Sequence, residues 1–221
     1  MGSHANTPKS VRGNGANPPA APVQNALALV ADVSNYSGNI TDAQAEAMKA
    51  AGVAGAIVRI DTADPGRIAI MQQQAGMFRA HGVSLGGYLF PNYEDRPADE
   101  LTRVWQLAGP LRSLWIDLEP VSGVMPTSFA VFRWWMAQAA LAMPSITTLG
   151  IYTAAWVVQL FGAKWMPLPY PLWAAAYGDR PTSLAINFGG WPYAAGIQFS
   201  DAGDIAGVSC DLSVFRPDLF T

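Results

Sequence analysis

The segment Leu111-Arg-Ser-Leu-Trp-Ile-Asp-Leu-Glu-Pro120 is an apolar, strand-like run that ends in two carboxylates, Asp117 and Glu119. Residues i and i+2 of a strand point to the same face, so both acids are expected on one face of a sheet. Burying two carboxylates together is costly unless they share a polar site. Paired carboxylates suit glycoside hydrolysis, in which one protonates the leaving oxygen and the other handles the positive charge that develops on the sugar. The same pattern also fits a strand end whose acids cap a helix or pair with arginines.

Short apolar strands and helical stretches alternate on both sides of this segment. The alternation predicts five strands, at 27–33, 55–60, 84–90, 112–119 and 148–152, and five helices, at 41–51, 67–81, 98–108, 127–143 and 154–161. Three further strands, at 171–177, 196–199 and 209–215, follow without helices. Alternating strands and helices imply parallel pairing with right-handed crossovers. The sequence therefore predicts an α/β fold in which the strands nearly close a barrel, with ligand chemistry at their carboxyl ends.

Composition sets the class of protein. The chain has 221 residues, of which 51% are hydrophobic and 13% charged, which favours one large domain. The formal net charge is −3 and the Lys and Arg residues form no cluster, which argues against nucleic acid as a partner. The apolar runs are shorter than the roughly 20 residues that span a bilayer, so no membrane insertion is expected. We expect a monomer.

The first 25 residues differ from the rest of the chain. They are rich in Asn, Pro, Ala and Gly and lack a hydrophobic period, which is typical of a disordered linker. Met1-Gly-Ser-His4 resembles an expression tag. The predicted division is a linker or tag over 1–25 and a single barrel domain over 26–221.

Few residues are available as zinc ligands or as a catalytic histidine. Cys210 is the only cysteine, and the two histidines are His4, in the linker, and His81, at an expected helix end. Zinc sites and Ser-His-Asp sites need a histidine or a cysteine set in the pocket. We therefore expect neither a metal nor another cofactor. Calcium bound by clustered acids is the alternative.

Acids and aromatic residues gather at the predicted strand ends. Asp32 ends the first strand, Asp61 follows the second, and Asp211 lies in the last. Because the first and last strands are neighbours in a closed barrel, Asp32 and Asp211 are expected to flank one pocket. Aromatic walls with carboxylates suit sugars, although each ring taken singly also fits core packing. The aromatic residues at these ends are Tyr36, Tyr88, Phe90, Tyr152, Trp173, Tyr177 and Phe199.

Eight short motifs, in order from Leu27 to Phe215, resemble those of the glycoside hydrolase family 25 lysozymes, the Chalaropsis-type muramidases of bacteria, fungi and phage endolysins. The opening D-V-S-x-[YW]-Q-G resembles Asp32-Val-Ser-Asn-Tyr-Ser-Gly38, and the L-D-x-E motif resembles Trp115-Ile-Asp-Leu-Glu119. The other six are Gly55-Ala-Ile-Val-Arg59, Gly86-Gly-Tyr-Leu-Phe90, Gly150-Ile-Tyr-Thr153, Leu172-Trp-Ala-Ala-Ala-Tyr177, Ile197-Gln-Phe-Ser200 and Cys210-Asp-Leu-Ser-Val-Phe215.

The resemblance implies a TIM-like, distorted (β/α)5β3 barrel and cleavage of the β-1,4 bond between N-acetylmuramic acid and N-acetylglucosamine. Peptidoglycan glycan strands would be the partner, and the enzyme would act outside the cell or on the cell wall, as an autolysin, a released endolysin or a virion component. Glu119 matches the general acid and Asp117 the carboxylate that stabilises the sugar or its N-acetyl group, with Asp32 and Asp211 as flanking acids. Asp117 and the other acids are expected to raise the pKa of Glu119. The residues expected to bind substrate are Tyr36, Asp61, Tyr88, Phe90, Tyr152, Trp173, Tyr177 and Gln198.

Three departures from the family pattern leave alternatives open. Leu89 stands where His is common, Ser37 where Gln is common, and Ile197 where Trp is usual, and each is expected to change the polarity of the pocket. These departures support a catalytically weakened module that binds the wall or forms part of a phage particle. A family 18 chitinase is a second alternative, although Ser113 and Trp115 occupy positions where its strand has acids. An α/β protein unrelated to sugars is the third.

Overall fold

The computed structural model describes residues 26–120, 125–143 and 148–220. Eight strands in these residues form a closed barrel in the order β1-β10-β9-β6-β5-β4-β3-β2. The barrel strands are β1 (Ala28–Val33), β2 (Val53–Ile60), β3 (Ser84–Leu89), β4 (Ser113–Asp117), β5 (Thr148–Ala154), β6 (Leu172–Ala175), β9 (Gly196–Ile205) and β10 (Val208–Phe215). The expected linker over 1–25 lies outside the described residues.

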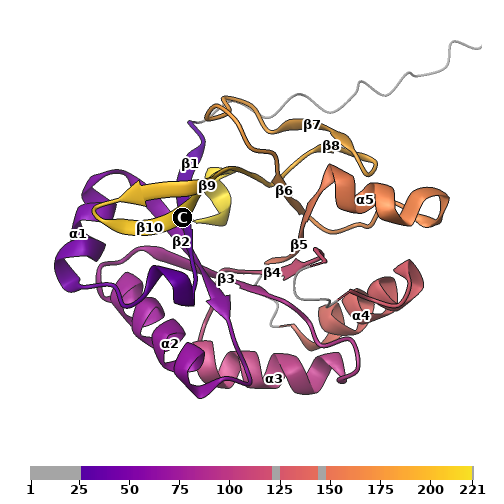
Figure 1. Ribbon diagram of the computed structural model, residues 1–221, viewed down its shortest axis with the longest axis horizontal. Helices are drawn as coiled ribbons and strands as arrows, with labels where there is room; N and C mark the ends of the chain where they lie inside the picture. Colours follow the sequence, from indigo (N-terminus) through magenta and orange to yellow (C-terminus); the bar gives the residue numbers. More distant parts are fainter. Residues whose placement is uncertain (1–25, 121–124, 144–147, 221) are drawn as a thin grey trace, which may run out of the picture.

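The helices cover the outside of the barrel (Figure 1). Thr41 accepts from the Gln44 amide in a capping box at the start of the first helix, and Asp64 and Ser128 cap the second and fourth. Pro97 occupies the first turn of the third, where its missing N–H is not needed. The helices are α1 (Asp42–Ala50), α2 (Pro65–Ala80), α3 (Pro97–Ala108), α4 (Phe129–Ala142) and α5 (Ala155–Phe161). None of them, within the described ranges, is long and apolar enough to cross a bilayer.

The strand directions confirm the expected distorted TIM-like barrel. β1 to β6 pair in parallel with their neighbours in the chain, and β6 also pairs in parallel with β9. β10 runs antiparallel to both β9 and β1 and closes the barrel between them. Five strand–helix units are thus followed by three barrel strands.

A two-stranded hairpin stands outside the barrel and was not expected from the sequence. It consists of β7 (Ala185–Phe188) and β8 (Trp191–Tyr193), and Figure 1 shows it beside β6, on the same side as α5. Gly189 and Gly190 form its turn with φ values of 63° and 84°, a left-handed conformation that favours glycine. Trp191 anchors the hairpin, because its ring contacts Trp165 and its indole N–H donates to the carbonyl of Tyr170.

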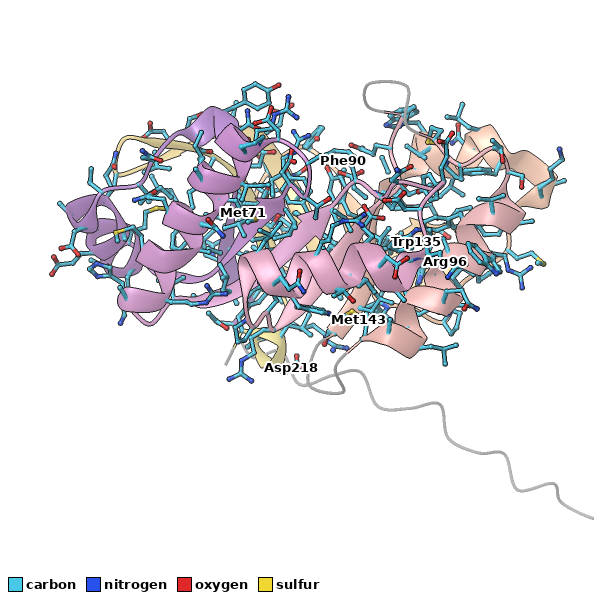
Figure 2. All side chains as sticks on the ribbon, turned by 90° about the horizontal axis from the view of Figure 1, so that it is seen from below. Met71, Phe90, Arg96, Trp135, Met143 and Asp218 are labelled. Atoms are coloured by element: carbon cyan, nitrogen blue, oxygen red, sulfur yellow. The ribbon has the colours of Figure 1, made fainter. Side chains whose placement is uncertain are left out.

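The barrel interior contains its own aromatic core, separate from the apolar layer beneath the helices. Trp115, Trp173 and Phe215 are fully buried there and pack edge-on or tilted against one another. The 3₁₀ turn η3 (Pro217–Leu219) and Phe220 close one end of the interior. Figure 2 shows Phe90 and Asp218, a member of η3, at opposite ends of the molecule. The interior is therefore filled at the end near Asp218, and a ligand could enter only at the end near Phe90.

Candidate active site

Strand alternation directs seven polar side chains into the open end of the barrel. Val30, Ile57 and Trp115 belong to the interior core, so the residues two positions later on β1, β2 and β4 also point inward. The same alternation applies to the inward-facing residues of β3, β5, β9 and β10. We call this set the polar ring: Asp32, Arg59, Tyr88, Asp117, Tyr152, Gln198 and Asp211.

Asp32 and Asp211 form a pair at the centre of the polar ring. They are opposite each other in the β1–β10 register, as expected for neighbouring strands. The Gln198 amide Nε2 donates to Asp32 Oδ1 and Oδ2, at 3.3 and 3.2 Å, and to Asp211 Oδ2 at 3.2 Å. Burial and the charge on Asp211 raise the pKa of Asp32 well above its usual range. Burial and the charge on Asp201 raise the pKa of Asp211 to about 6.

Two tyrosines fix the orientation of the Gln198 amide. Its Oε1 accepts from the hydroxyl of Tyr152 at 2.7 Å and from the hydroxyl of Tyr177 at 3.1 Å. Since Oε1 faces the two donors, Nε2 must face the two carboxylates. Gln198 is only 2% exposed, which places it behind the pair rather than in the path of a ligand.

Asp117 and Glu119 flank the end of β4, where the chain leaves the barrel. The intervening Leu118 is held on both sides: its N–H donates to the Tyr152 carbonyl and its carbonyl accepts from the Thr153 hydroxyl. Asp117 is 3% exposed and its Oδ1 has no hydrogen-bond partner among the described residues, whereas Glu119 is half-buried. Glu119 is therefore the carboxyl group of this pair that a ligand can reach more readily.

Burial raises the pKa of both carboxyl groups. For Asp117 burial is the largest cause and the charge on Glu119 the next, while Arg59 acts in the opposite direction. For Glu119, burial alone accounts for the raised pKa. The expectation that neighbouring acids raise the pKa of Glu119 was therefore wrong. Asp117 retains its proton over the range in which Glu119 ionises, so Glu119 titrates beside a neutral group.

A pocket of about 320 Å³ opens beside this end of the barrel. Tyr36, Tyr88 and Phe90 form its aromatic walls, and Tyr36, which follows β1, is 83% exposed. Its charged lining residues are Asp32, Arg59, Asp201 and Asp211. An acidic pocket with exposed rings can stack the apolar face of a sugar and bind its hydroxyls.

Arg59 and Asp201 were not identified from the sequence. Arg59 was read only as part of a strand motif, although Ile57 two residues earlier is inward-facing and alternation would have indicated its direction. The Arg59 guanidinium carbon lies 5.0 Å from the centre of the Phe90 ring, a cation–π contact. Asp201 lies in the part of β9 that extends beyond its expected end at 199.

Two of the residues predicted to bind substrate lie elsewhere. Asp61 accepts from the N–H groups of Ala63 and Asp64 and pairs with Arg67 at 3.6 Å, so its carboxylate organises the start of α2. Trp173 is 1% exposed, and its indole N–H donates to the Ser213 hydroxyl at 3.0 Å. Trp173 forms the floor beneath the polar ring, in contact with the rings of Tyr88 and Tyr152.

Two of the three departures from the family pattern lie outside the pocket. Leu89 and Ile197 are both buried in the apolar layer under the helices, because alternation turns them away from Tyr88 and Gln198. The expectation that they change the polarity of the pocket was therefore wrong. Ser37 does line the pocket, and its hydroxyl accepts from the Ser34 N–H at 3.3 Å.

The donor set does not favour a metal ion. Within the described ranges, no three His, Cys, Asp or Glu side chains are grouped as metal ligands. Cys210 borders the pocket, but burial and the charges of Asp32 and Asp211 raise its pKa to about 12, so it is a neutral thiol.

The fold is shared with several solved structures. The lysozyme from Streptomyces coelicolor superimposes with a TM-score of 0.64 at 22% identity, over 86% of this chain and 92% of that chain. The muramidase from Trichobolus zukalii gives 0.67 at 17%, over 86% and 93%. The modular autolysin LytC from Streptococcus pneumoniae, solved with a synthetic peptidoglycan ligand, gives 0.61 at 18%, over 86% and 47%.

Comparison of the sequence with protein-family models gives no match. Comparison with curated proteins gives none either. At 16 to 22% identity the similarity to solved structures concerns the fold. The chain therefore has the barrel fold of the bacterial lysozyme, the fungal muramidases, the phage endolysins and the pneumococcal autolysin whose structures it matches.

Proposed function

We propose that the protein is a peptidoglycan hydrolase that cleaves the β-1,4 bond between N-acetylmuramic acid and N-acetylglucosamine. The observation that carries this proposal is the placement of Asp117 and Glu119 together at the carboxyl end of β4, with the pKa of both groups raised by burial. In barrels of this class the chemistry lies at this end of the strands. The shared fold supports the same choice of substrate, since a structural relative was solved with a peptidoglycan ligand.

Glu119 is the proposed general acid. Its half-buried carboxyl group can reach a glycosidic oxygen, and its raised pKa keeps the proton available at mildly acidic pH. A bound sugar would exclude more water from this group and raise its pKa further. Glu119 would then protonate the leaving oxygen while the bond to the sugar breaks.

Asp117 is the proposed stabiliser of the reacting sugar. It lies deeper than Glu119, and its Oδ1, without a hydrogen-bond partner among the described residues, can accept from a ligand. Burial favours the neutral form of Asp117 in the empty site, whereas stabilisation of a cationic transition state needs the charged form. Positive charge developing on the sugar would lower the pKa of Asp117, so the substrate itself would move the pair toward the reactive protonation state.

Asp32, Asp211 and the aromatic walls are proposed to hold the glycan strand. The two carboxylates have fixed positions because Gln198 donates to both, and Tyr36, Tyr88 and Phe90 offer ring faces in the adjoining pocket. Leu89 and Ile197 give no support to a weakened, non-catalytic module, since both lie outside the pocket.

Digestion of purified cell walls tests the proposal. Clearing of wall suspensions would be followed on walls from several bacteria, and mass spectrometry would identify the sugar at each new reducing end. A muramidase releases reducing-end N-acetylmuramic acid. Reducing-end N-acetylglucosamine, or no cleavage of any wall by the folded protein, would contradict the proposal.

A pair of variants links the cleavage to Glu119. Glu119→Gln keeps the shape of the side chain but cannot donate the proton, and we expect it to fold normally and to lose at least about 100-fold in rate. Glu94→Gln is the matched control, because Glu94 is exposed on the loop before α3. Near wild-type cleavage by folded Glu119→Gln would exclude Glu119 as the acid.

A further inference from the structure

Arg59 places a positive charge in a pocket whose other charged lining residues, within the described parts of the chain, are Asp32, Asp201 and Asp211. Cleavage of a glycosidic bond does not require this cation, because the transition state is itself positively charged. The guanidinium therefore needs another explanation than the chemical step.

The guanidinium of Arg59 has no polar partner in residues 26–120, 125–143 and 148–220. Its one defined contact is the face of the Phe90 ring, at 5.0 Å. Other arginines with defined partners are satisfied by the protein: Arg67 pairs with Asp61, Arg103 with Asp95, and Arg79 donates to two backbone carbonyls. Stacking on Phe90 covers a face of the guanidinium and leaves its edge, with five N–H donors, available to a ligand in the pocket.

We propose that Arg59 binds a carboxylate of the substrate, carried by the lactyl group of N-acetylmuramic acid or by the start of its stem peptide. This inference rests on the proposed function and specifies which of the two sugars lies against Phe90. A planar guanidinium held by an aromatic ring matches the geometry of a carboxylate, which it can bind with two parallel hydrogen bonds. Asp32 and Asp211 do not satisfy it, because Gln198 is their defined donor.

The role of Arg59 also accounts for the charge of the pocket. Three aspartates line the same cavity, and without a cation they would repel an acidic sugar. A neutral sugar such as N-acetylglucosamine would not need Arg59. The arrangement thus predicts a preference for the acidic sugar at the pocket that Tyr36, Tyr88 and Phe90 enclose.

Binding of monosaccharides separates this inference from catalysis. Calorimetry or NMR titration would compare N-acetylmuramic acid, its methyl ester, N-acetylmuramoyl-L-alanine and N-acetylglucosamine on the wild-type protein. A charge-assisted hydrogen bond contributes enough for roughly a tenfold difference in affinity. We expect the acid to bind at least about tenfold more tightly than its ester and than N-acetylglucosamine. The alanine derivative distinguishes the two carboxylate sources: tighter binding than the free acid assigns the stem peptide, and weaker binding assigns the lactyl group.

Substitution of Arg59 completes the test. In Arg59→Gln, folded by circular dichroism, N-acetylmuramic acid should bind no better than N-acetylglucosamine, whereas Arg103→Gln should behave like the wild type, because Arg103 pairs with Asp95 outside the pocket. Retention of the preference by Arg59→Gln, or equal binding of acid and ester by the wild-type protein, would overturn the inference while leaving the hydrolase proposal intact. Failure of every sugar to bind the wild-type protein would overturn both.

Discussion

Asp32 and Asp211 lie directly opposite each other in the antiparallel pair of β1 and β10, and the amide of Gln198 donates to both carboxylates. The same amide accepts from Tyr152 and Tyr177. One buried side chain therefore connects two carboxyl groups and two phenols, each from a different element or loop. Its removal should be felt by the whole polar ring.

Gln198→Leu should destabilise the fold and impair wall cleavage. The Tyr152 hydroxyl would lose its acceptor inside the barrel, at a cost of about 1–3 kcal/mol in the free energy of unfolding. The pKa of Asp32 should rise further, since the amide donor that lowers it is gone. Urea unfolding measures the first effect. Gln72→Leu is the control, because Gln72 is exposed, and a cost for Gln198→Leu no larger than for the control would contradict this prediction.

Glu119→Gln should lower the pKa of Asp117. The charge on Glu119 is the second cause, after burial, that raises the pKa of Asp117, and a glutamine carries no charge. The reciprocal variant Asp117→Asn should leave the pKa of Glu119 nearly unchanged, because burial alone raises it. Carbon-detected NMR titration of the carboxyl groups measures both values. An unmoved Asp117, or a large shift of Glu119 in Asp117→Asn, would refute the proposed order of ionisation.

The free energy of unfolding should fall as the pH rises from about 4.5 to about 7, with Glu100 as one cause. Burial raises the pKa of Glu100 from 4.5 to about 7. Between these values the folded protein holds a proton that the unfolded chain has released, so rising pH favours unfolding. The contribution of Glu100 is about 3 kcal/mol across this range.

Asp32, Asp117 and Asp211 act in the same direction, since the pKa of each is also raised. Glu100→Gln should therefore flatten the pH profile of stability without abolishing its slope. The exposed Glu46→Gln should follow the wild type. A Glu100→Gln profile parallel to that of the wild type would show that Glu100 does not hold the proton.

Gly150→Ala should destabilise the barrel, because a Cβ atom at this position would lie 2.2 Å from Cζ3 of Trp115 and 3.1 Å from the Pro171 carbonyl oxygen. Trp115 is fully buried between Trp173 and Phe215 and has little room to move. We expect a loss of about 1–3 kcal/mol or more in thermal or urea unfolding. Gly76→Ala provides the contrast, since nothing lies near its Cβ position in α2 and alanine should stabilise the helix by up to about 1 kcal/mol. Equal stability of the two variants would contradict the packing described for the interior.

Wall cleavage should not depend on a divalent ion. The pocket offers carboxylates, a guanidinium and aromatic rings, and Cys210 stays protonated. Dialysis against EDTA should leave the rate of cleavage unchanged. Loss of activity that calcium or magnesium restores would identify a metal site among the acids.

The alternation of strands and helices was sufficient to predict the barrel, because each strand between Ala28 and Ala154 has its own apolar run and each is followed by a helix. The register of β1 and β10 followed from closure, which brought Asp32 and Asp211 together. The β7–β8 hairpin could not be predicted in this way. Its residues are largely exposed, so their hydrophobic pattern is weak, and only Gly189 and Gly190 signal a turn.

The individual site residues depended on directions that composition does not reveal. Asp61 precedes Asp64 and Pro65, and this helix-start pattern already indicates a capping role instead of a place in the pocket. Trp173 and Arg59 both point inward, but at different depths: Trp173 packs with Phe215, whereas Arg59 lies at the rim beside Phe90. Depth along a barrel depends on the shear between strands, which a single sequence does not state.

The polar ring draws on both the first and the last strands of the barrel, which gives the molecule an order of events. Asp117 and Glu119 are in place once β4 has paired with β3 and β5, but the Asp32–Asp211 pair cannot exist until β10 has been synthesised and has joined β1. If this pair is needed to hold the glycan, a nascent chain on the ribosome, or a fragment cut before Val208, is harmless to a wall. Completion of the chain would then act as the arming step of a lytic protein.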